Sequence, residues 1–415
     1  MLHTAFTCNA LKFKQLFSLI AHACSGAGGI ERFTKATADY YGIDKERVFL
    51  FGSARMGLYS FLKSLKPNPD DEVLVAGYTC VVVTNAIKYA GLKAVYVDID
   101  ESNLNINTQA LLESINVNTK VVVVTHNFGI TYEDIGLIKE KHPEIIIVED
   151  AAHTIGSVDS NGQKAGLLGD AAFVSLEYSK CISTGMGGIF IVNCQLSIVD
   201  FRRDYERLPF YPKRISRKIF LTLLAHLSTS HRWTIPFKGI KIGAVRFLGM
   251  EFISSPEEIK GEMPSHYPVR LSPGLANIGY LQMKKMQEIN KIKDRIIAEY
   301  HENLKDIPGI EQYYSQKYNY VRYPLVFRKT IEQPVIDAIK KDLARLGISV
   351  GEWFNDVVHP KGSYRYCYTE GHCPVGESVS SRIINLPVNI NTTLSEAKLR
   401  KVRLIFEKYL TSPAL

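Results

Sequence analysis

The sequence predicts an α/β protein with a doubly wound, mostly parallel sheet between two layers of helices, followed by a smaller C-terminal α/β domain. Short apolar runs rich in β-branched residues recur through the first half of the chain, as in strands buried on both faces. Segments with helical periodicity lie between several of these runs, and this alternation is typical of parallel sheets with crossover helices.

The elements of the large sheet are predicted in chain order. The strand patterns lack the period-two polarity of a half-solvated sheet, and the helical patterns carry polar residues on one side. Buried strands are predicted at 73–75, 94–99, 120–125, 144–148, 171–176 and 188–192. Helices are predicted at 29–41, 55–65, 81–89, 108–115 and 132–141.

The chain divides into an N-terminal arm and two domains. Residues 1–28 are predicted to form the arm, 29–290 the large domain and 291–415 the small domain. A basic insertion at about 201–262 interrupts the large domain. A long charged helix at 283–303 leads into the small domain, where a strand in "YNYVRYPLVFR" and helices at 333–346 and 394–410 are predicted.

Composition indicates a soluble globular protein. The 415 residues are 46% hydrophobic and 22% charged, which is enough for a sizeable core. The seven cysteines are scattered, odd in number and without metal-ligand spacing, so we expect free thiols and a cytoplasmic location. Residues 201–247 contain eleven Lys and Arg but two acidic residues, which gives this segment a charge of +9. The net charge of the whole chain is +8, so the rest of the chain is close to neutral. This asymmetry argues against a surface that coats nucleic acid.

Two adjacent carboxylates, Glu149 and Asp150, follow the apolar run that ends at Val148. Ligands of open α/β sheets collect where such strands end, so we expect the carboxylates to meet a ligand. In "SLEYSKCISTGMGG", Ser175 ends another predicted strand and Lys180 follows five residues later.

A third segment, "FGSARMGL", places Gly52, Ser53 and Ala54 before a predicted helix, where free backbone N–H groups and the helix dipole favour a phosphate. Pyridoxal phosphate needs a lysine amine for its aldehyde, a carboxylate facing its ring nitrogen and a phosphate cradle. Lys180, Asp150 and this segment supply all three. The carboxylate keeps the ring nitrogen protonated, and the freed lysine is the natural base for the substrate proton.

An ordered series of segments resembles the DegT/StrS family of PLP-dependent sugar aminotransferases, of the aspartate aminotransferase fold type I. The similar segments are "GSARMGLYSFLKSL", "GYTCVVVTNAIKYAGLKAVYVDID", "THNFG", "VEDAAHTIGS", "VSLEYSKCISTGMGG", "YPVRLSPGLANIGYLQMKKM" and "INLPV". They run through nearly the whole chain, and their order makes the signal specific.

The resemblance implies roles for individual residues. Lys180 matches the lysine that bonds the cofactor's aldehyde, and Asp150 matches the partner of the ring nitrogen. His153 stands where the family has Gln or His and would contact the phenolic oxygen of the cofactor. Gly52, Ser53, Ala54 and Ser175 match the phosphate-binding positions.

The resemblance also implies a reaction and partners. An amino-acid donor, glutamate, gives its amino group through pyridoxamine phosphate to a keto sugar, which we expect to be nucleotide-linked. Homodimers with shared active sites and a place in the synthesis of amino sugars for surface polysaccharide are implied as well.

This chain departs from the family pattern at several positions. Cys80 stands where relatives stack an aromatic ring on the cofactor, so Tyr78 or a residue from elsewhere would have to cover that face. Met186 replaces a glutamate of the glycine-rich turn, and Pro268 replaces an Asn that relatives supply from the neighbouring subunit. Substrate contacts are expected from Arg270, two residues further on, and from Trp353 and His359 in the small domain.

The basic insertion has two interpretations. Residues 213–228 join four cations to an apolar run at 219–227, which is too short to span a bilayer but fits a helix lying in a membrane interface. The other interpretation is a helix that packs on the protein with its cations solvated or facing the diphosphate of a nucleotide sugar.

Two alternative functions remain open. One is a PLP-dependent sugar dehydratase or lyase on the same fold; family members of that kind can replace the lysine by histidine, so Lys180 counts against it. The other is a non-catalytic binding or regulatory protein, which the departures at Cys80, Met186 and Pro268 allow.

Overall fold

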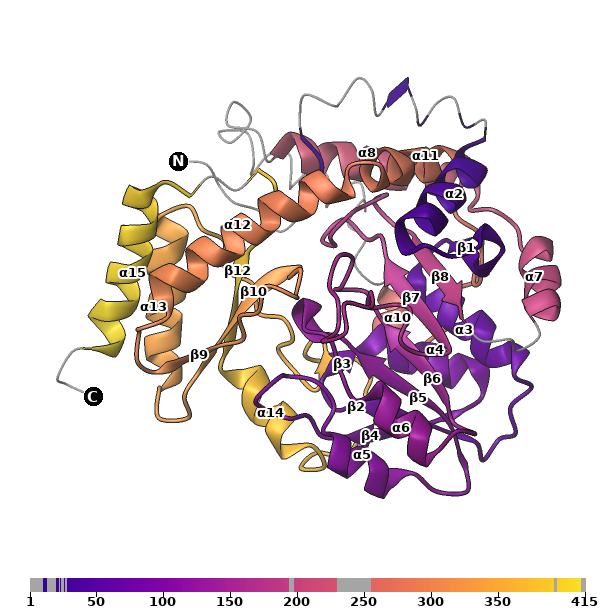
Figure 1. Cartoon of the computed structure of the whole chain (residues 1–415), viewed down its shortest axis with the longest axis horizontal. Coiled ribbons are helices and arrows are strands. Elements are labelled where there is room, and N and C mark those ends of the chain that lie inside the picture. Colours follow the sequence, from indigo (N-terminus) through magenta and orange to yellow (C-terminus); the bar gives the residue numbers. More distant parts are fainter. Residues whose placement is uncertain are drawn as a thin grey trace.

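The computed structural model describes residues 10–12, 20–21, 23, 26, 28–193, 198–229, 255–391 and 394–411. A seven-stranded sheet covered by helices on both faces forms its larger part, on the right of Figure 1. From one edge to the other the strands are β1 (Val48–Phe51), β8 (Gly188–Val192), β7 (Ala171–Ser175), β6 (Ile146–Asp150), β5 (Thr119–Thr125), β2 (Glu72–Ala76) and β4 (Lys93–Val97).

The sheet is mostly parallel, as predicted. Each neighbouring pair from β4 through β2, β5 and β6 to β7 is parallel. Strand β8 runs antiparallel to both β7 and β1, so among the described strands of this sheet it alone is reversed. The sequence prediction of a doubly wound α/β sheet is therefore confirmed.

Alternation along the strands explains why they are apolar throughout. In β2, Val73 and Val75 belong to the hydrophobic cluster on one face, and Leu74 and Ala76 belong to the cluster on the other. Successive side chains of a strand point to opposite faces, so a strand covered on both sides must be apolar at every position.

The helices contribute to these two clusters according to the face that they cover. The first face receives α2 (Gly29–Tyr41), α3 (Ala54–Ser64), α4 (Val81–Ala90), α7 (Ile198–Arg207), α8 (Lys213–Thr229) and α11 (Pro273–Met283). The second face receives α5 (Thr108–Ser114) and α6 (Ile135–Lys141). The short helix α10 (Pro256–Ile259) packs beside α4.

The C-terminal part forms a smaller sheet whose core is continuous with the second face. Its strands, in order, are β12 (Ile383–Pro387), β10 (Arg322–Phe327) and β9 (Ile310–Gln312), all antiparallel. Its helices are α12 (Met286–Leu304), α13 (Gln333–Arg345), α14 (Pro374–Ser381) and α15 (Glu396–Leu410). Helix α12 reaches from the large sheet to this part, on the left of Figure 1. A boundary at residue 290 stays a prediction.

A short parallel pair joins the two parts of the chain. Strand β3 (Thr79–Cys80), which precedes α4, pairs with β11 (Val358–His359) from the C-terminal part. The segment around residues 353–360 is thereby held against the large sheet.

Three of the differences from the sequence prediction concern the large sheet and the helix between β5 and β6. Strand β1, four residues long, was not predicted. Helix α6 begins at Ile135 rather than at 132, because the backbone N–H of Tyr132 donates to Nδ1 of His126 at 2.9 Å. Strand β6 extends through Glu149 and Asp150, which were predicted to follow it.

Helix α8 carries the apolar run that suggested a membrane-facing helix. Ile219, Leu223 and Leu227 are buried in the core, while Leu221 is 53% exposed. Spacings of four residues place the buried three on one helix face, so that face packs on the protein. Across the described ranges, no helix combines the length and the apolar character that crossing a membrane requires.

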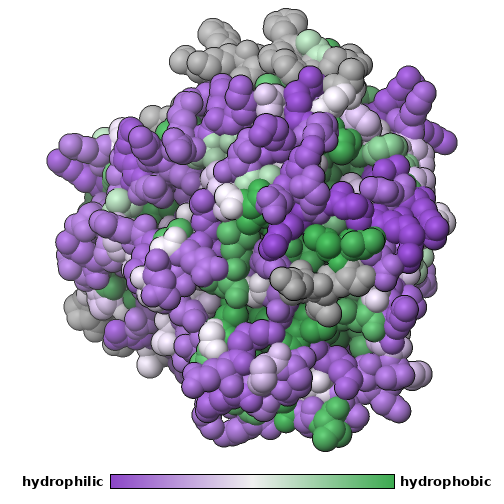
Figure 2. All heavy atoms as spheres, turned by 45° about the vertical axis from the view of Figure 1, so that its right-hand side comes forward, coloured by the Kyte–Doolittle hydropathy of each residue, from purple (hydrophilic) through white to green (hydrophobic). Residues whose placement is uncertain are grey.

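The face turned forward in Figure 2 shows a band of hydrophobic side chains between hydrophilic margins.

Candidate active site

A cavity lies at the carboxyl ends of β6 and β7, where the sequence predicted a ligand. Asp150 and Ser175 are the last residues of these two strands. Both line the cavity together with Ala54, His153 and Lys180. The structure thus brings together residues that the sequence placed in three separate segments.

The second wall of the cavity comes from elsewhere in the chain. Cys80 lines it at the start of α4, and Trp353 and His359 line it from the C-terminal part. The predicted candidates Trp353 and His359 therefore face the same cavity as Lys180.

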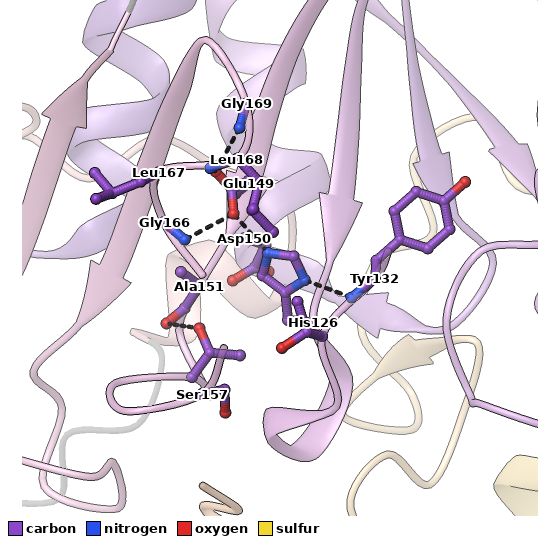
Figure 3. Close-up of polar contacts among 12 residues, drawn as sticks. His126, Tyr132, Glu149, Asp150, Ala151, Ser157, Gly166, Leu167, Leu168 and Gly169 are labelled. Atoms are coloured by element: carbon purple, nitrogen blue, oxygen red, sulfur yellow. Dashed lines mark hydrogen bonds and ion pairs between the residues drawn. The ribbon is translucent and has the colours of Figure 1, made fainter. Parts of the chain in front are cut away.

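The two adjacent carboxylates of β6 do different work because their side chains point to opposite faces of the sheet. Glu149 is fully buried and accepts backbone N–H groups of Gly166, Leu168 and Gly169, each at 2.7 Å. Nε2 of His126 also lies 2.8 Å from this carboxylate (Figure 3). Because Nδ1 of His126 accepts the Tyr132 N–H, Nε2 carries the proton and donates to Glu149. Glu149 therefore fastens the loop before β7 and takes no part in the cavity.

Asp150 faces the cavity instead. Its side chain is buried, and Oδ1 accepts the backbone N–H of Ala152 at 3.1 Å. Burial raises the pKa of the Asp150 carboxyl to about 6, against the lowering effects of the Ala152 hydrogen bond and of the Lys180 charge. A cation placed beside this carboxylate would favour its ionised form.

Lys180 lies on the turn that follows β7. Its Nζ is 4.2 Å from the centre of the Trp353 ring. Burial lowers the pKa of the Lys180 amine, and the charge of Glu177 offsets part of this shift. A lysine with a lowered pKa supplies more neutral amine, which is the form that attacks a carbonyl and accepts a proton.

His153 presents a hydrogen-bond donor to the cavity. Its Nδ1 accepts the backbone N–H of Phe128 at 3.1 Å. Burial lowers the pKa of His153 well below its ordinary value, so the ring is neutral and its proton lies on Nε2. The ring stacks on Trp353 with 5.0 Å between centroids and 15° between planes. A ligand oxygen in the cavity can accept from this Nε2–H.

The start of α3 fits a phosphate group. Ser53 occupies the N-cap position and is 1% exposed, yet its side chain does not cap the helix. Among the described residues, no donor or acceptor pairs with its Oγ. Gly188 on β8 packs against the backbone of Ser53 and Ala54, where any Cβ would clash. A buried hydroxyl without a protein partner, next to free N–H groups at a helix N-terminus, is the chemistry of a phosphate cradle.

Four predicted site residues do not line the cavity of this chain: Ser53, which adjoins the lining residue Ala54, and Gly52, Tyr78 and Arg270. The Gly52 N–H donates to the Val269 carbonyl at 2.8 Å, so this donor is not free for a phosphate. The Tyr78 hydroxyl donates to the Phe354 carbonyl at 3.1 Å and accepts the Phe354 N–H at 2.9 Å, which fixes the ring in the core. The guanidinium carbon of Arg270 lies 4.1 Å from the centre of the Phe210 ring, and Arg270 is absent from the cavity lining.

Sequence reasoning also missed residues. Glu177 lines the cavity, although its place between Ser175 and Lys180 was a visible signal. Arg322 is buried on β10 with its guanidinium carbon 3.2 Å from the centre of the Trp353 ring. Arg55 lines the cavity and forms a buried ion pair with Glu258 of α10. No sequence pattern links positions so far apart.

Cys181, beside the lysine, is buried. Its Sγ lies 3.2 Å from Nζ of the buried Lys293.

Comparison with known proteins agrees with this geometry. Residues 24–197 and 240–403 match the DegT/DnrJ/EryC1/StrS aminotransferase family. The dTDP-4-dehydro-2,3,6-trideoxy-D-glucose 4-aminotransferase of Saccharopolyspora spinosa is 22% identical over 91% of this chain and 88% of its own length.

Two solved structures have the same fold. One is a Streptococcus pneumoniae protein assigned as a sugar aminotransferase, known in PMP and PLP forms; the PMP form covers 99% of both chains at 17% identity and a TM-score of 0.73. The other is the E. coli GDP-4-keto-6-deoxy-D-mannose-3-dehydratase with bound hydrated PLP, with 91% of both chains covered at 17% identity and a TM-score of 0.66.

The family match covers most of the chain, and the cavity holds a lysine, a carboxylate and a helix start suited to one cofactor. The chain therefore belongs to the DegT/DnrJ/EryC1/StrS aminotransferase family, whose cofactor is pyridoxal phosphate.

Proposed function

We propose that the chain transfers an amino group from glutamate to the carbonyl group of a nucleotide-linked keto sugar, in the synthesis of amino sugars for surface polysaccharide. One observation carries the proposal: Lys180 and Asp150 line a single cavity that also contains the start of α3. When bound, pyridoxal phosphate supplies an aldehyde and a ring that accepts electrons from the substrate.

Each cavity residue has a task in this reaction. Ser53, Ala54 and Ser175 would hold the phosphate, and Asp150 would keep the ring nitrogen protonated. The neutral His153 would donate its Nε2–H to the phenolic oxygen. Lys180 would bond the aldehyde, be released by the incoming amine and then move the proton at the substrate carbon through its Nζ.

The ring-covering group is the open question that Cys80 raised. Tyr78 is held in the core by Phe354, so it does not serve. We propose Trp353, because it lines the cavity and already stacks on His153.

A dehydratase on the same fold is the second candidate, since one such enzyme is among the structural neighbours. Lys180 favours amino transfer over this alternative, because a lysine serves both to bond the cofactor and to move the proton.

A cytoplasmic homodimer with shared active sites is proposed on the family resemblance. The hydrophobic band in Figure 2 supports an interface, because contiguous apolar surface on a soluble protein often marks one. For α8 we propose packing on the protein rather than on a membrane, because its apolar side is in the core.

The visible spectrum of the purified protein with PLP, before and after glutamate addition, tests the proposal. We expect a band from the lysine-bound cofactor that fades as pyridoxamine phosphate forms. A band that persists with glutamate would redirect the work to other donors or to dehydration. A protein that binds no PLP would favour a non-catalytic role.

A further inference from the structure

Glu177 is a cavity carboxylate that the mechanism above does not use. It lies in the turn between β7 and Lys180 and lines the cavity. Its Oε2 accepts the backbone N–H of Ser179 at 3.1 Å and also the Ser179 hydroxyl. Its Oε1 is buried, and no donor among the described residues reaches it.

Such an oxygen is costly in a folded protein. A buried acceptor without a donor has lost its hydration without a replacement, and the penalty is larger when the acceptor is charged. Native structures keep such groups chiefly where a ligand or an ordered solvent molecule completes them. Ser179 fixes one oxygen of Glu177, so the carboxylate is oriented before any ligand arrives.

The other polar groups of the cavity are already assigned. Asp150 is proposed to face the cofactor ring nitrogen, and His153 to face the phenolic oxygen. The carboxylate of Glu177 is then the acidic cavity group left for the substrate. Burial raises the pKa of Glu177, and the charges of Lys180 and Arg322 oppose this shift, yet no donor among the described residues, these two cations included, reaches its Oε1. The missing partner is therefore a donor on the ligand, and the neutral donors of a sugar are its hydroxyl groups.

We propose that Glu177 accepts a hydrogen bond from a hydroxyl group of the acceptor sugar close to its keto carbon, and so selects hydroxylated keto sugars over their deoxy analogues. The inference rests on the proposed function and narrows its substrate class. Carboxylates are strong acceptors for hydroxyl groups, and a charge-assisted hydrogen bond is about twice as strong as a neutral one.

Two acceptors make the test. GDP-4-keto-6-deoxy-D-mannose carries a hydroxyl at C3, next to the keto carbon C4, and another at C2, one carbon further away, and dTDP-4-dehydro-2,3,6-trideoxy-D-glucose lacks both. Each is added to the pyridoxamine-phosphate form of wild type and of Glu177→Gln, and the return of the visible band gives kcat/KM. We expect Glu177→Gln to lower the value about tenfold or more for the hydroxylated sugar and less than about threefold for the deoxy sugar.

Two controls separate contact from charge. Glu352→Gln changes an exposed carboxylate paired with Lys340 and should alter neither acceptor. Glu177→Asp keeps the charge but withdraws the oxygen by one methylene, so it should also lose the preference for the hydroxylated sugar. Glu177→Gln also removes the charge that offsets part of the lowered pKa of Lys180, so its effect on the fading of the band with glutamate measures the charge, and only a further loss confined to the hydroxylated sugar measures the contact.

The outcomes are distinct. Equal losses on both sugars, or a loss in the glutamate step alone, would make Glu177 a residue that positions Lys180 and would overturn the inference. If wild type aminates neither sugar, calorimetry measures how tightly each sugar binds the pyridoxamine-phosphate form of wild type and of Glu177→Gln. Weaker binding of the hydroxylated sugar to Glu177→Gln than to wild type supports the contact. Equal binding to both proteins, or no binding, overturns it. Failure of the wild-type band to fade with glutamate would instead refute the proposed function, while the binding comparison still judges Glu177.

Discussion

The sites of Glu149 and Asp150, on opposite faces of strand β6, differ in how many of their buried polar groups have hydrogen-bond partners within the protein. On one face, Glu149 accepts three backbone N–H groups and the His126 ring, all from within the protein. At the cavity, Oε1 of the lining residue Glu177 and Oγ of Ser53, which adjoins the lining residue Ala54, are buried without partners among the described residues. Satisfied networks hold a fold together, whereas unsatisfied groups mark where a ligand is expected.

The largest effect should come from Lys180→Ala. Without the amine, the cofactor loses its bond to the protein and the substrate proton loses its base, so turnover should fall about 10³-fold or more. Stopped-flow absorbance with glutamate measures this. Lys120→Ala, at an exposed position, is the matched control. Undiminished steady-state turnover in Lys180→Ala would refute the assigned role.

Exchanging the two neighbouring carboxylates for amides tests the comparison directly. Glu149→Gln puts an amide among three N–H donors and should lower the free energy of unfolding by about 3 kcal/mol. Asp150→Asn should leave the free energy of unfolding within about 1 kcal/mol of wild type at neutral pH or raise it, yet lower turnover about 10²-fold. Urea unfolding and the glutamate assay measure the two effects. A loss of turnover in Glu149→Gln without a loss of stability, together with a loss of stability in Asp150→Asn, would contradict the structural role of Glu149 and the catalytic role of Asp150.

The pH dependence of stability without cofactor should carry the signature of Asp150. Its folded pKa of about 6 exceeds its ordinary value of 3.8, so the folded state binds this proton more tightly than the unfolded state does. The resulting stabilisation is present below about pH 4 and is lost as pH rises through about 6, a change of about 2–3 kcal/mol. Urea unfolding from pH 4 to 7 should show this component in wild type but not in Asp150→Asn. Identical curves would refute it.

The smallest effect concerns His153. His153→Gln keeps an N–H donor and should leave turnover within about threefold of wild type, whereas His153→Ala should lose about tenfold. Because burial keeps His153 neutral, neither variant should shift the pH profile near 6.5. Equal losses in both variants would show that ring stacking on Trp353 matters more than the donor.

The sequence predicted the mostly parallel sheet, six of its seven strands and the three segments that supply Lys180, Asp150 and the start of α3 to one cavity. Lys180, Asp150 and His153 sit at strand ends, where chain-local patterns place them. What could not be foreseen depends on contacts between distant positions. Tyr78 was expected at the cofactor, but its hydroxyl is occupied by Phe354, 276 residues later. Glu177 belongs to no sequence motif, and its place in the cavity lining is what indicates a role in binding.

The pairing of β3 with β11 has a consequence for how the protein is made. The cavity wall that carries Trp353 and His359 is joined to Thr79 and Cys80 by strand pairing across most of the chain. During synthesis the large sheet can assemble long before Val358 leaves the ribosome, yet the cofactor site stays without one wall until then. We therefore expect pyridoxal phosphate to bind each new chain only after residues 353–359 have been synthesised. A chain truncated before residue 350 would lack this wall even when its large sheet had formed.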